Sequence, residues 1–299
     1  MGTDFKIIID DNNKSLCQKA AKKAFEEAHR LNKIFSDYLA HSETSALSAA
    51  SFSERNDEYI KVSDELLKVL KFSWQLSNET AGDFDVTIGP ASRLWRVARF
   101  RKTLPDPVKI KNALSRIGFH KILFHPSENK VRLDHKGMLL DFGGVAKGFA
   151  GDQMLRLLND FGLNRCLIDA GGDIIIGQAP KGKSGWRVKI GGEKHPELPS
   201  LILSNCAVAT SGDTEQFVMI GDKTYSHIIN PHTGTGLNTR AQVTVIANDG
   251  MIADSLASAA LVSGLKSSAK YFEKYNIKSA FFITHEDGVK KLKEYGVVR

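Results

Sequence analysis

The chain has 299 residues, of which 42% are hydrophobic and 25% are charged, and this composition excludes collagen-like, disulfide-scaffold and wholly disordered proteins. Its 41 Lys and Arg residues exceed its 34 Asp and Glu residues by seven, and the excess is spread along the whole sequence. Proteins that bind nucleic acid usually gather such charge on one face or helix, so we expect no nucleic-acid partner. The three cysteines lack metal-binding spacing, and no apolar run approaches the ~20 residues that span a bilayer.

The first half of the chain is predicted to contain long helices and short strands. A strand at 5–9 precedes a helix from Ser15 to Phe35, in which apolar residues keep a near-helical spacing. A helix over 63–79 begins with Ser63 as its N-cap and carries two acidic residues in its first turn. After a Pro-rich loop we expect, in order, a helix at about 107–117 and strands near 121–124, 130–134 and 138–141.

The second half of the chain is richer in strands. A Gly-rich turn at 143–148 opens a predicted helix at 148–161. Strands follow at 166–169, 173–177, 186–191, 200–204, 206–209, 216–220, 224–228 and 242–247. The chain then closes with helices at 251–263 and 265–274, a strand at 278–283 and a short tail. Because the strands come in meandering runs with helices inserted between them, the sequence predicts an α+β fold with mainly antiparallel sheets. We expect a single domain over 1–299, or two closely packed halves that meet near 135–150.

One segment that could bind a ligand is the Gly-rich turn itself, Asp141-Phe142-Gly143-Gly144-Val145-Ala146-Lys147-Gly148. Glycines let the backbone approach a ligand closely, and the N-terminus of the following helix presents free N–H groups to a phosphate. Lys147 would add a positive charge there. The glycine spacing fits neither a Walker A loop nor a dinucleotide fingerprint, so a plain strand-to-helix turn is the alternative. A second Gly-rich segment, Asp169-Ala170-Gly171-Gly172-Asp173, is interpreted as a turn without a chemical role.

Two further segments carry hydroxyl, imidazole and carboxylate groups. Thr210 and Ser211 lie beside a glycine, and His227 leaves an apolar strand just before a Pro–Gly turn, where its imidazole would face a cleft. A structural histidine is the alternative at that position. Asp254 and Ser258 are four residues apart at the start of an apolar helix and share one face. Their hard oxygens suit Mg²⁺, although an acidic residue in a first turn can also simply complement the helix dipole.

Taken in order, these segments resemble the ApbE-type FAD:protein FMN transferases, also called flavin transferases. The resemblance extends to the opening Met1-Gly2-Thr3, to Phe35–Tyr38 followed by Ser42-Glu43, and to the stretch from Gly82 to Pro90. It implies a T-fold-like α+β body with helices packed on the sheets and FAD in a cleft between its parts. It also implies a Mg²⁺-dependent transfer of the FMN half of FAD to a Thr or Ser hydroxyl of a target protein, with release of AMP.

The resemblance also implies a set of site residues, carried over by motif position. The FAD site would include Met1, Tyr38, Asp83, Phe84, Asp85, Asp141 and Lys147, with Thr210, Ser211, His227 and Ile228 near the flavin or the phosphates. The metal would lie between Asp254, Ser258 and the carbonyl of Gly144. His227 is the better candidate for the general base, and Asp254 acting through a water is the alternative. The sequence departs from the family pattern in three places: Ser258 replaces a common Thr, Asn230 replaces an Asp, and residues 44–48 lack the usual Arg and Asn and are assigned no role.

Other functions are compatible with the same residues. An FAD pyrophosphatase would use water in place of the protein hydroxyl, and a flavin-binding or storage protein would need no metal site. The family suggests a periplasmic or membrane-anchored protein whose lipoprotein leader has been removed, although cytoplasmic members exist. The expected partner is a target flavoprotein subunit of the redox-pump type.

Overall fold

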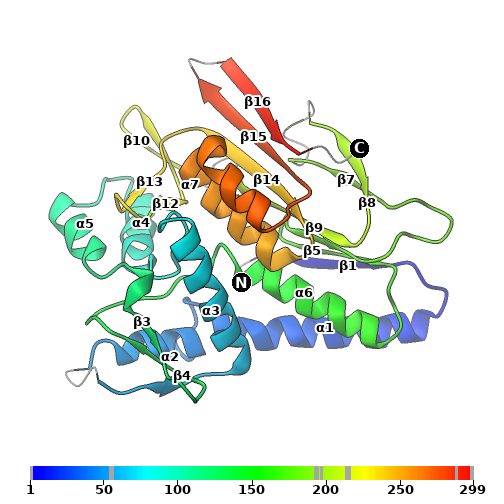
Figure 1. Ribbon diagram of the computed structural model, residues 1–299, viewed down its shortest axis with the longest axis horizontal. Coiled ribbons are helices and arrows are strands. Elements are labelled where there is room, and N and C mark those ends of the chain that lie inside the picture. Colours follow the sequence, from blue (N-terminus) through cyan, green and yellow to red (C-terminus); the bar gives the residue numbers. More distant parts are fainter. Residues whose placement is uncertain are drawn as a thin grey trace.

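The structure is a computed structural model that describes residues 3–53, 57–191, 195, 198–212, 217–286 and 289–296. Its centre is a seven-stranded sheet, shown at the right of Figure 1, in which the strand order is β1-β5-β6-β9-β14-β15-β16. Every pair of neighbouring strands in this sheet is antiparallel, as the sequence predicts. The strands are β1 (Phe5–Ile9), β5 (Cys166–Ala170), β6 (Ile174–Ile176), β9 (Cys206–Gly212), β14 (Ala241–Ala247), β15 (Ser279–Glu286) and β16 (Val289–Tyr295).

Three long helices cover one face of this sheet. Helices α6 (Ala146–Asp160) and α7 (Gly250–Lys274) pack on the strands, and α1 (Lys14–Phe35) packs against α6 on its outer side (Figure 1). Buried side chains from the helices and the strands form one large apolar cluster between the two layers. Burial of this apolar area is the main stabilising contribution of this layer. The opposite face of the sheet is covered by the hairpin β7 (Trp186–Lys189) and β8 (Ser200–Leu203).

The N-terminal turns of α6 and α7 touch through their backbones. A Cβ atom built on Gly148 would lie 2.0 Å from the carbonyl oxygen of Gly250, and one built on Gly250 would lie 2.6 Å from that of Gly148. No side chain fits at either position, so both glycines are required for this close approach. The contact brings the start of α6 next to the start of α7.

A second, mainly helical part lies beside the sheet, at the left of Figure 1. It contains helices α2 (Glu43–Ala50), α3 (Asp64–Glu79), α4 (Gly89–Arg101) and α5 (Pro107–Leu114) and the 3₁₀ turn η1 (Phe119–Lys121). A small sheet has the order β2 (Ile60–Lys61), β4 (Lys130–Leu133), β3 (Ile122–Phe124). Two short hairpins complete this part: β10 (Phe217–Ile220) with β11 (Lys223–Ser226), and β12 (Ile229–Asn230) with β13 (Thr235–Gly236).

Most predicted elements are confirmed, some with shifted ends. The hydroxyl of Ser63 accepts a hydrogen bond from the N–H of Leu66 and caps α3 as predicted. Gly264 has φ 75° and ψ 165°, so α7 is kinked at the junction between the two helices predicted there. The strand expected at 224–228 ends at Ser226, and a turn separates it from β12.

Two predictions of secondary structure are wrong and two helices were missed. Residues 138–141 form no strand, because Leu139 makes only an isolated bridge to Ile88. The expected short tail is the edge strand β16, which pairs with β15 along its whole length. Helix α2 is short, and α4 starts with Gly-Pro and is rich in arginine, so neither gives a clear apolar periodicity.

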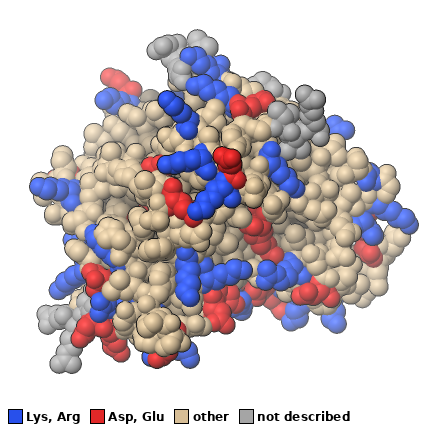
Figure 2. All heavy atoms as spheres, in the orientation of Figure 1, with Lys and Arg blue, Asp and Glu red and all other residues tan. Residues whose placement is uncertain are grey.

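No helix in the described part of the chain combines the length and the apolar character that a membrane span requires. Across the helices in the lower half of Figure 2, Lys and Arg side chains alternate with Asp and Glu side chains. The positive net charge is therefore not gathered into one basic patch on that part of the surface.

Candidate active site

Two adjoining cavities of about 340 and 510 Å³ form one cleft beside the end of the central sheet. They share lining residues from α4, from the 141–147 turn and from the segment between β11 and β12. The first cavity is lined by nearly all the residues that the sequence assigned to the site: Asp83, Phe84, Asp85, Asp141, Gly144, Lys147, Thr210, Ser211, His227, Ile228, Asp254 and Ser258. Tyr38 lines the second cavity, and Met1 lies outside the described residues.

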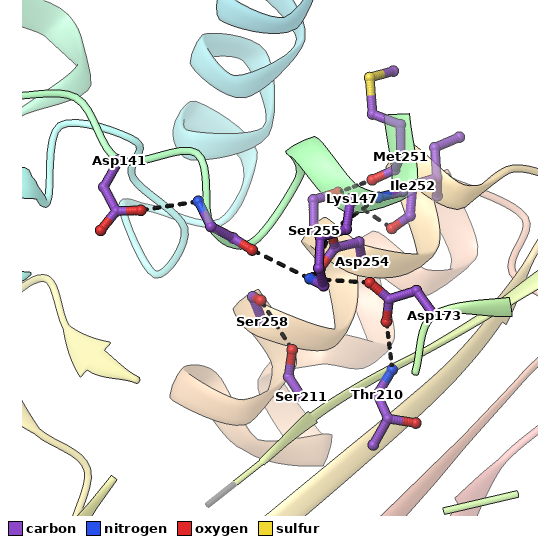
Figure 3. A network of polar contacts seen from close by, with 12 residues as sticks. Asp141, Lys147, Asp173, Thr210, Ser211, Met251, Ile252, Asp254, Ser255 and Ser258 are labelled. Atoms are coloured by element: carbon purple, nitrogen blue, oxygen red, sulfur yellow. Dashed lines mark hydrogen bonds and ion pairs between the residues drawn. The ribbon is translucent and has the colours of Figure 1, made fainter. Parts of the chain in front are cut away.

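Lys147 lies in the first turn of α6 with its ammonium between two carboxylates (Figure 3). Its Nζ is 3.0 Å from Oδ2 of Asp173 and 3.3 Å from both carboxylate oxygens of Asp254. Burial alone would lower the pKa of Lys147, but the two negative charges outweigh burial and raise the pKa above its ordinary value. The side chain therefore stays a cation and cannot serve as a base at neutral pH.

Asp173 is a site residue that the sequence analysis missed. Its side chain is only 3% exposed and accepts a hydrogen bond from the N–H of Thr210 at 3.3 Å. Burial raises the pKa of Asp173 to about 7, the nearby Asp254 adds to this effect, and Lys147 opposes it. The interpretation of 169–173 as a turn without a chemical role is thus wrong for its last residue. The signal available in the sequence was an acidic residue directly before a strand of three isoleucines.

Asp254 and Ser258 project from the same face of α7, as their spacing predicts. Besides the Lys147 contact, Asp254 accepts a hydrogen bond from the N–H of Gly148 at 3.2 Å. The hydroxyl of Ser258 is 3.0 Å from the hydroxyl of Ser211 on β9. Gly144 lies directly against them, since a Cβ atom there would be 2.8 Å from Oγ of Ser258. The Gly-rich turn, α7 and β9 thus converge on one point of the cleft.

The groups at this point have the chemistry that Mg²⁺ prefers. A carboxylate, a hydroxyl and a backbone carbonyl are hard oxygen ligands, and Mg²⁺ typically takes one or two carboxylates and completes its shell with water and phosphate oxygens. No cluster of three His, Cys, Asp or Glu side chains suited to a metal exists among the described residues. The oxygens of Asp254, Ser258 and Gly144 have the chemistry to hold a magnesium ion whose other ligands would be water and the phosphate oxygens of a substrate.

Arg96 contacts three other residues that line the second cavity. Its guanidinium pairs with Oδ2 of Asp37 at 2.5 Å and with Oδ2 of Asp141 at 3.1 Å, and it lies 4.1 Å from the ring centre of Tyr38. Asp141 also accepts the N–H of Gly143 at 2.9 Å, so the same carboxylate shapes the Gly-rich turn. Tyr38 is 72% exposed, and its ring offers an aromatic surface beside the cleft.

Two of the predicted carboxylates are occupied by protein contacts. Asp85 is buried and accepts hydrogen bonds from the backbone and hydroxyl of Thr87 and from the N–H of Phe119. Asp83 contacts the Nε2 of His232 at 2.9 Å. Both carboxylates therefore fix the 83–88 loop that forms one wall of the cleft. His227 lies between β11 and β12 and lines both cavities.

Comparison with known proteins gives a consistent result. The ApbE family model matches residues 1–282. Two curated relatives are called FAD:protein FMN transferase. The one from Treponema pallidum is 30% identical, over 82% of this chain and 72% of its own length. The one from Haemophilus influenzae is 27% identical, over 96% of this chain and 86% of its own length. The solved structure of the flavin transferase ApbE from Vibrio cholerae has a TM-score of 0.80 and 27% identity, covering 99% of this chain and 94% of its own. The solved structure of the ApbE protein from Thermotoga maritima has a TM-score of 0.81 and 25% identity, covering 98% of this chain and 93% of its own. The chain belongs to the ApbE family.

Proposed function

We propose that this protein is an FAD:protein FMN transferase that moves the FMN half of FAD to a Thr or Ser hydroxyl of an acceptor protein. In this reaction the acceptor oxygen forms a bond to the FMN phosphorus, and the bond from that phosphorus to the bridging oxygen of the pyrophosphate breaks. AMP leaves with the bridging oxygen. The supporting observation is the single cleft in which Lys147, Asp254 and Ser258 meet the Gly-rich turn, in a chain whose named relatives are flavin transferases.

The protein's own charges suit a pyrophosphate substrate. Lys147 remains a cation, and it lies in the first turn of α6, where the helix dipole adds positive potential. Glycines at 143 and 144 leave room for phosphate oxygens next to this helix end. We propose that these groups bind and orient the two phosphates.

We propose Asp254, Ser258 and the carbonyl of Gly144 as the protein ligands of Mg²⁺. When bound, the ion supplies electrostatic stabilisation of the charge that develops on the phosphate oxygens. Asp173 and Asp254 both contact the ammonium of Lys147, so Asp173 would still hold the lysine when Asp254 binds the ion.

His227 is the better candidate for the group that takes the acceptor's proton. An acceptor hydroxyl is a weak nucleophile and needs a base within hydrogen-bond reach. The carboxylate of Asp254 already accepts contacts from Lys147 and from the N–H of Gly148. His227 lines both cavities and carries a ring nitrogen that can accept the proton.

The pair formed by Tyr38 and Arg96 suits one of the aromatic ring systems of FAD. An exposed phenol ring with a guanidinium on one face leaves its other face for stacking. From the resemblance we further propose that the acceptor is a redox-pump subunit and that the protein acts on the periplasmic side of the membrane, tethered through a lipoprotein leader. Cell fractionation with an antibody to the protein tests this location.

Incubation of the protein with FAD, Mg²⁺ and a flavin-acceptor domain tests the proposed function. The acceptor is expected to gain the mass of one FMN less one water, and one AMP is released for each transfer. Chelation of the metal with EDTA should stop both changes. If AMP and free FMN appear equally fast with and without the acceptor, and the acceptor gains no mass, the protein is a pyrophosphatase. If FAD binds and stays intact, the protein is a flavin-binding protein.

A further inference from the structure

Helix α4 forms a ridge between the cleft and a separate groove. On one side of the helix, Trp95, Arg96 and Arg99 line the second cavity of the cleft. On the other side, Arg93 and Leu94 line a groove of about 340 Å³ that also touches α5. A molecule that reaches into the cleft over this rim must therefore pass along the exposed crest of α4.

The crest carries large apolar side chains that are open to solvent. Phe100 is 90% exposed and Val97 is 50% exposed, and their spacing of three residues places them on one face of α4. Leu104, in the link that follows α4, and Val108, in the first turn of α5, are also exposed, at 53% and 65%. Contiguous exposed apolar residues of this size often mark a protein–protein contact, and aromatic residues frequently dominate its binding energy.

The groove beside the crest is positively charged. Arg93, Lys109 and Arg116 line it, and no acidic side chain does so in the described part of the chain. None of these three cations takes part in an ion pair with another described residue. Arg101 and Lys102 at the end of α4 are also exposed. The charge of this region is thus complementary to an acidic surface.

We propose that this α4 surface, made of Val97, Phe100, Leu104 and Val108 with the adjoining groove, is where the flavin-acceptor protein docks. This proposal rests on the proposed function, because only a macromolecular acceptor must cover the rim while its hydroxyl reaches the phosphorus. The fitting partner is a folded protein with an apolar spot surrounded by acidic residues close to its acceptor Thr or Ser. Docking on α4 would place that residue at the mouth of the cleft.

The test compares two acceptors, a folded flavin-acceptor domain and the short peptide that contains its acceptor Thr. The double variant Val97→Ser, Phe100→Ser should lower kcat/KM for the folded domain by about 10-fold or more through KM, and leave kcat/KM for the peptide unchanged. Ile202→Ser is the matched control, because Ile202 is 47% exposed on β8, far from α4 in Figure 1. Arg93→Glu with Lys109→Glu should slow association with the domain and reduce its salt dependence.

Direct binding of the domain to the enzyme without FAD, measured by calorimetry, separates this proposal from the proposed function. Binding that is lost in the double variant supports docking on α4 even if no FMN is transferred. Equal losses for domain and peptide, or no loss for either, would overturn the proposal. Two further results would overturn it, each with binding of the domain unchanged. If the double variant no longer sediments with phosphatidylglycerol vesicles, the occupant is a membrane. If the double variant no longer self-associates, the occupant is a second copy of this chain.

Discussion

The ammonium of Lys147 lies closer to Asp173 than to Asp254, at 3.0 Å from the former and 3.3 Å from the latter. Lys147 comes from the first turn of α6, whereas Asp173 comes from the turn that precedes β6. Both carboxylates are 3% exposed, so the single positive charge of Lys147 faces two buried carboxylates that water screens little. We infer that Asp173 holds Lys147 in place, so that Lys147 stays beside Asp254 when Asp254 also binds a metal ion.

The first prediction concerns this pair. Asp173→Asn keeps the shape of the side chain but removes the negative charge that raises the pKa of Lys147. The alkaline limb of the pH profile of kcat/KM should move to lower pH, because Asp254 alone then opposes loss of the lysine proton. The matched control is Asp169→Asn at the end of β5, just before the same turn, since the carboxylate of Asp169 accepts the N–H of Gly172 at 2.8 Å. A profile that coincides with that of the wild type would contradict the role given to Asp173.

The second prediction concerns the metal ligands. Asp254→Asn removes the single carboxylate from the proposed Mg²⁺ site and should lower FAD turnover by about 100-fold or more at any Mg²⁺ concentration. Ser258→Ala should lose only about 10-fold and recover at higher Mg²⁺, because water can replace a neutral hydroxyl ligand. Ser255→Ala is the control, since its hydroxyl donates to the carbonyl of Met251 within the same helix. Turnover by Asp254→Asn at the wild-type rate would refute the site.

The third prediction concerns the base. His227→Ala should lower the rate of transfer by about 10²- to 10⁴-fold while FAD binding, measured by fluorescence quenching, changes little. The wild-type rate should also decrease as the pH is lowered and the imidazole is protonated. His232→Ala serves as the comparison, because His232 contacts Asp83 on the cleft wall. If weaker FAD binding accounts for the whole effect of His227→Ala, the residue binds FAD and does not take the proton.

The fourth prediction concerns stability at the start of α7. Asp152 on α6 accepts the N–H groups of Gly250 and Met251 at 2.7 and 2.9 Å. Burial, with a smaller contribution from Asp249, raises the pKa of Asp152 from 3.8 to about 7. Between these two values the folded protein keeps a proton that the unfolded chain has released, so this carboxyl lowers the free energy of unfolding as the pH rises.

The expected slope from Asp152 is at most about 1.4 kcal/mol per pH unit, since a single proton is involved. Asp152→Asn cannot titrate and should lack this slope. Urea denaturation of both proteins at pH 5 and at pH 8 measures the difference, with the wild type losing more stability than the variant over this range. If the free energies of unfolding of the two proteins change equally with pH, the pKa of Asp152 in the folded protein is the same as in the unfolded chain.

The sequence identified the elements whose signals are local. The long helices α1 and α3 were predicted from the apolar periodicity within each segment, and α3 also from its cap at Ser63. Strand β16 was missed because its run of Val289–Tyr295 is rich in lysine, which is typical of an exposed edge strand and also of a disordered tail. The opposite error occurred at 138–141, where an apolar run is buried without joining a sheet. In both cases the outcome depends on neighbours that are distant in the sequence.

The same distinction explains what was found of the site. Asp254 and Ser258 could be paired from the sequence because they are four residues apart on one helix. Asp173 could not be recognised, because its partners Lys147 and Asp254 come from α6 and α7 and only the fold brings them to it. The carboxylate of Asp85 was assigned to the FAD site, and the structure adds that its oxygens are bound by Thr87 and Phe119. Motif position identifies the wall of a cleft more reliably than it identifies which atoms face the substrate.

The backbone contact between Gly148 and Gly250 has a consequence for hybrid proteins made from two members of the family. Lys147 and Asp254 come from different helices, and the distance between them depends on the closeness of those two glycines. A hybrid that takes α6 from one parent and α7 from the other keeps this spacing only if both parents have glycine at the contact. A Cβ atom on either side would push the two helix ends apart and separate the lysine from the aspartate. The starts of α6 and α7 should therefore be taken from the same parent when such hybrids are made, although about a hundred residues separate them in the chain.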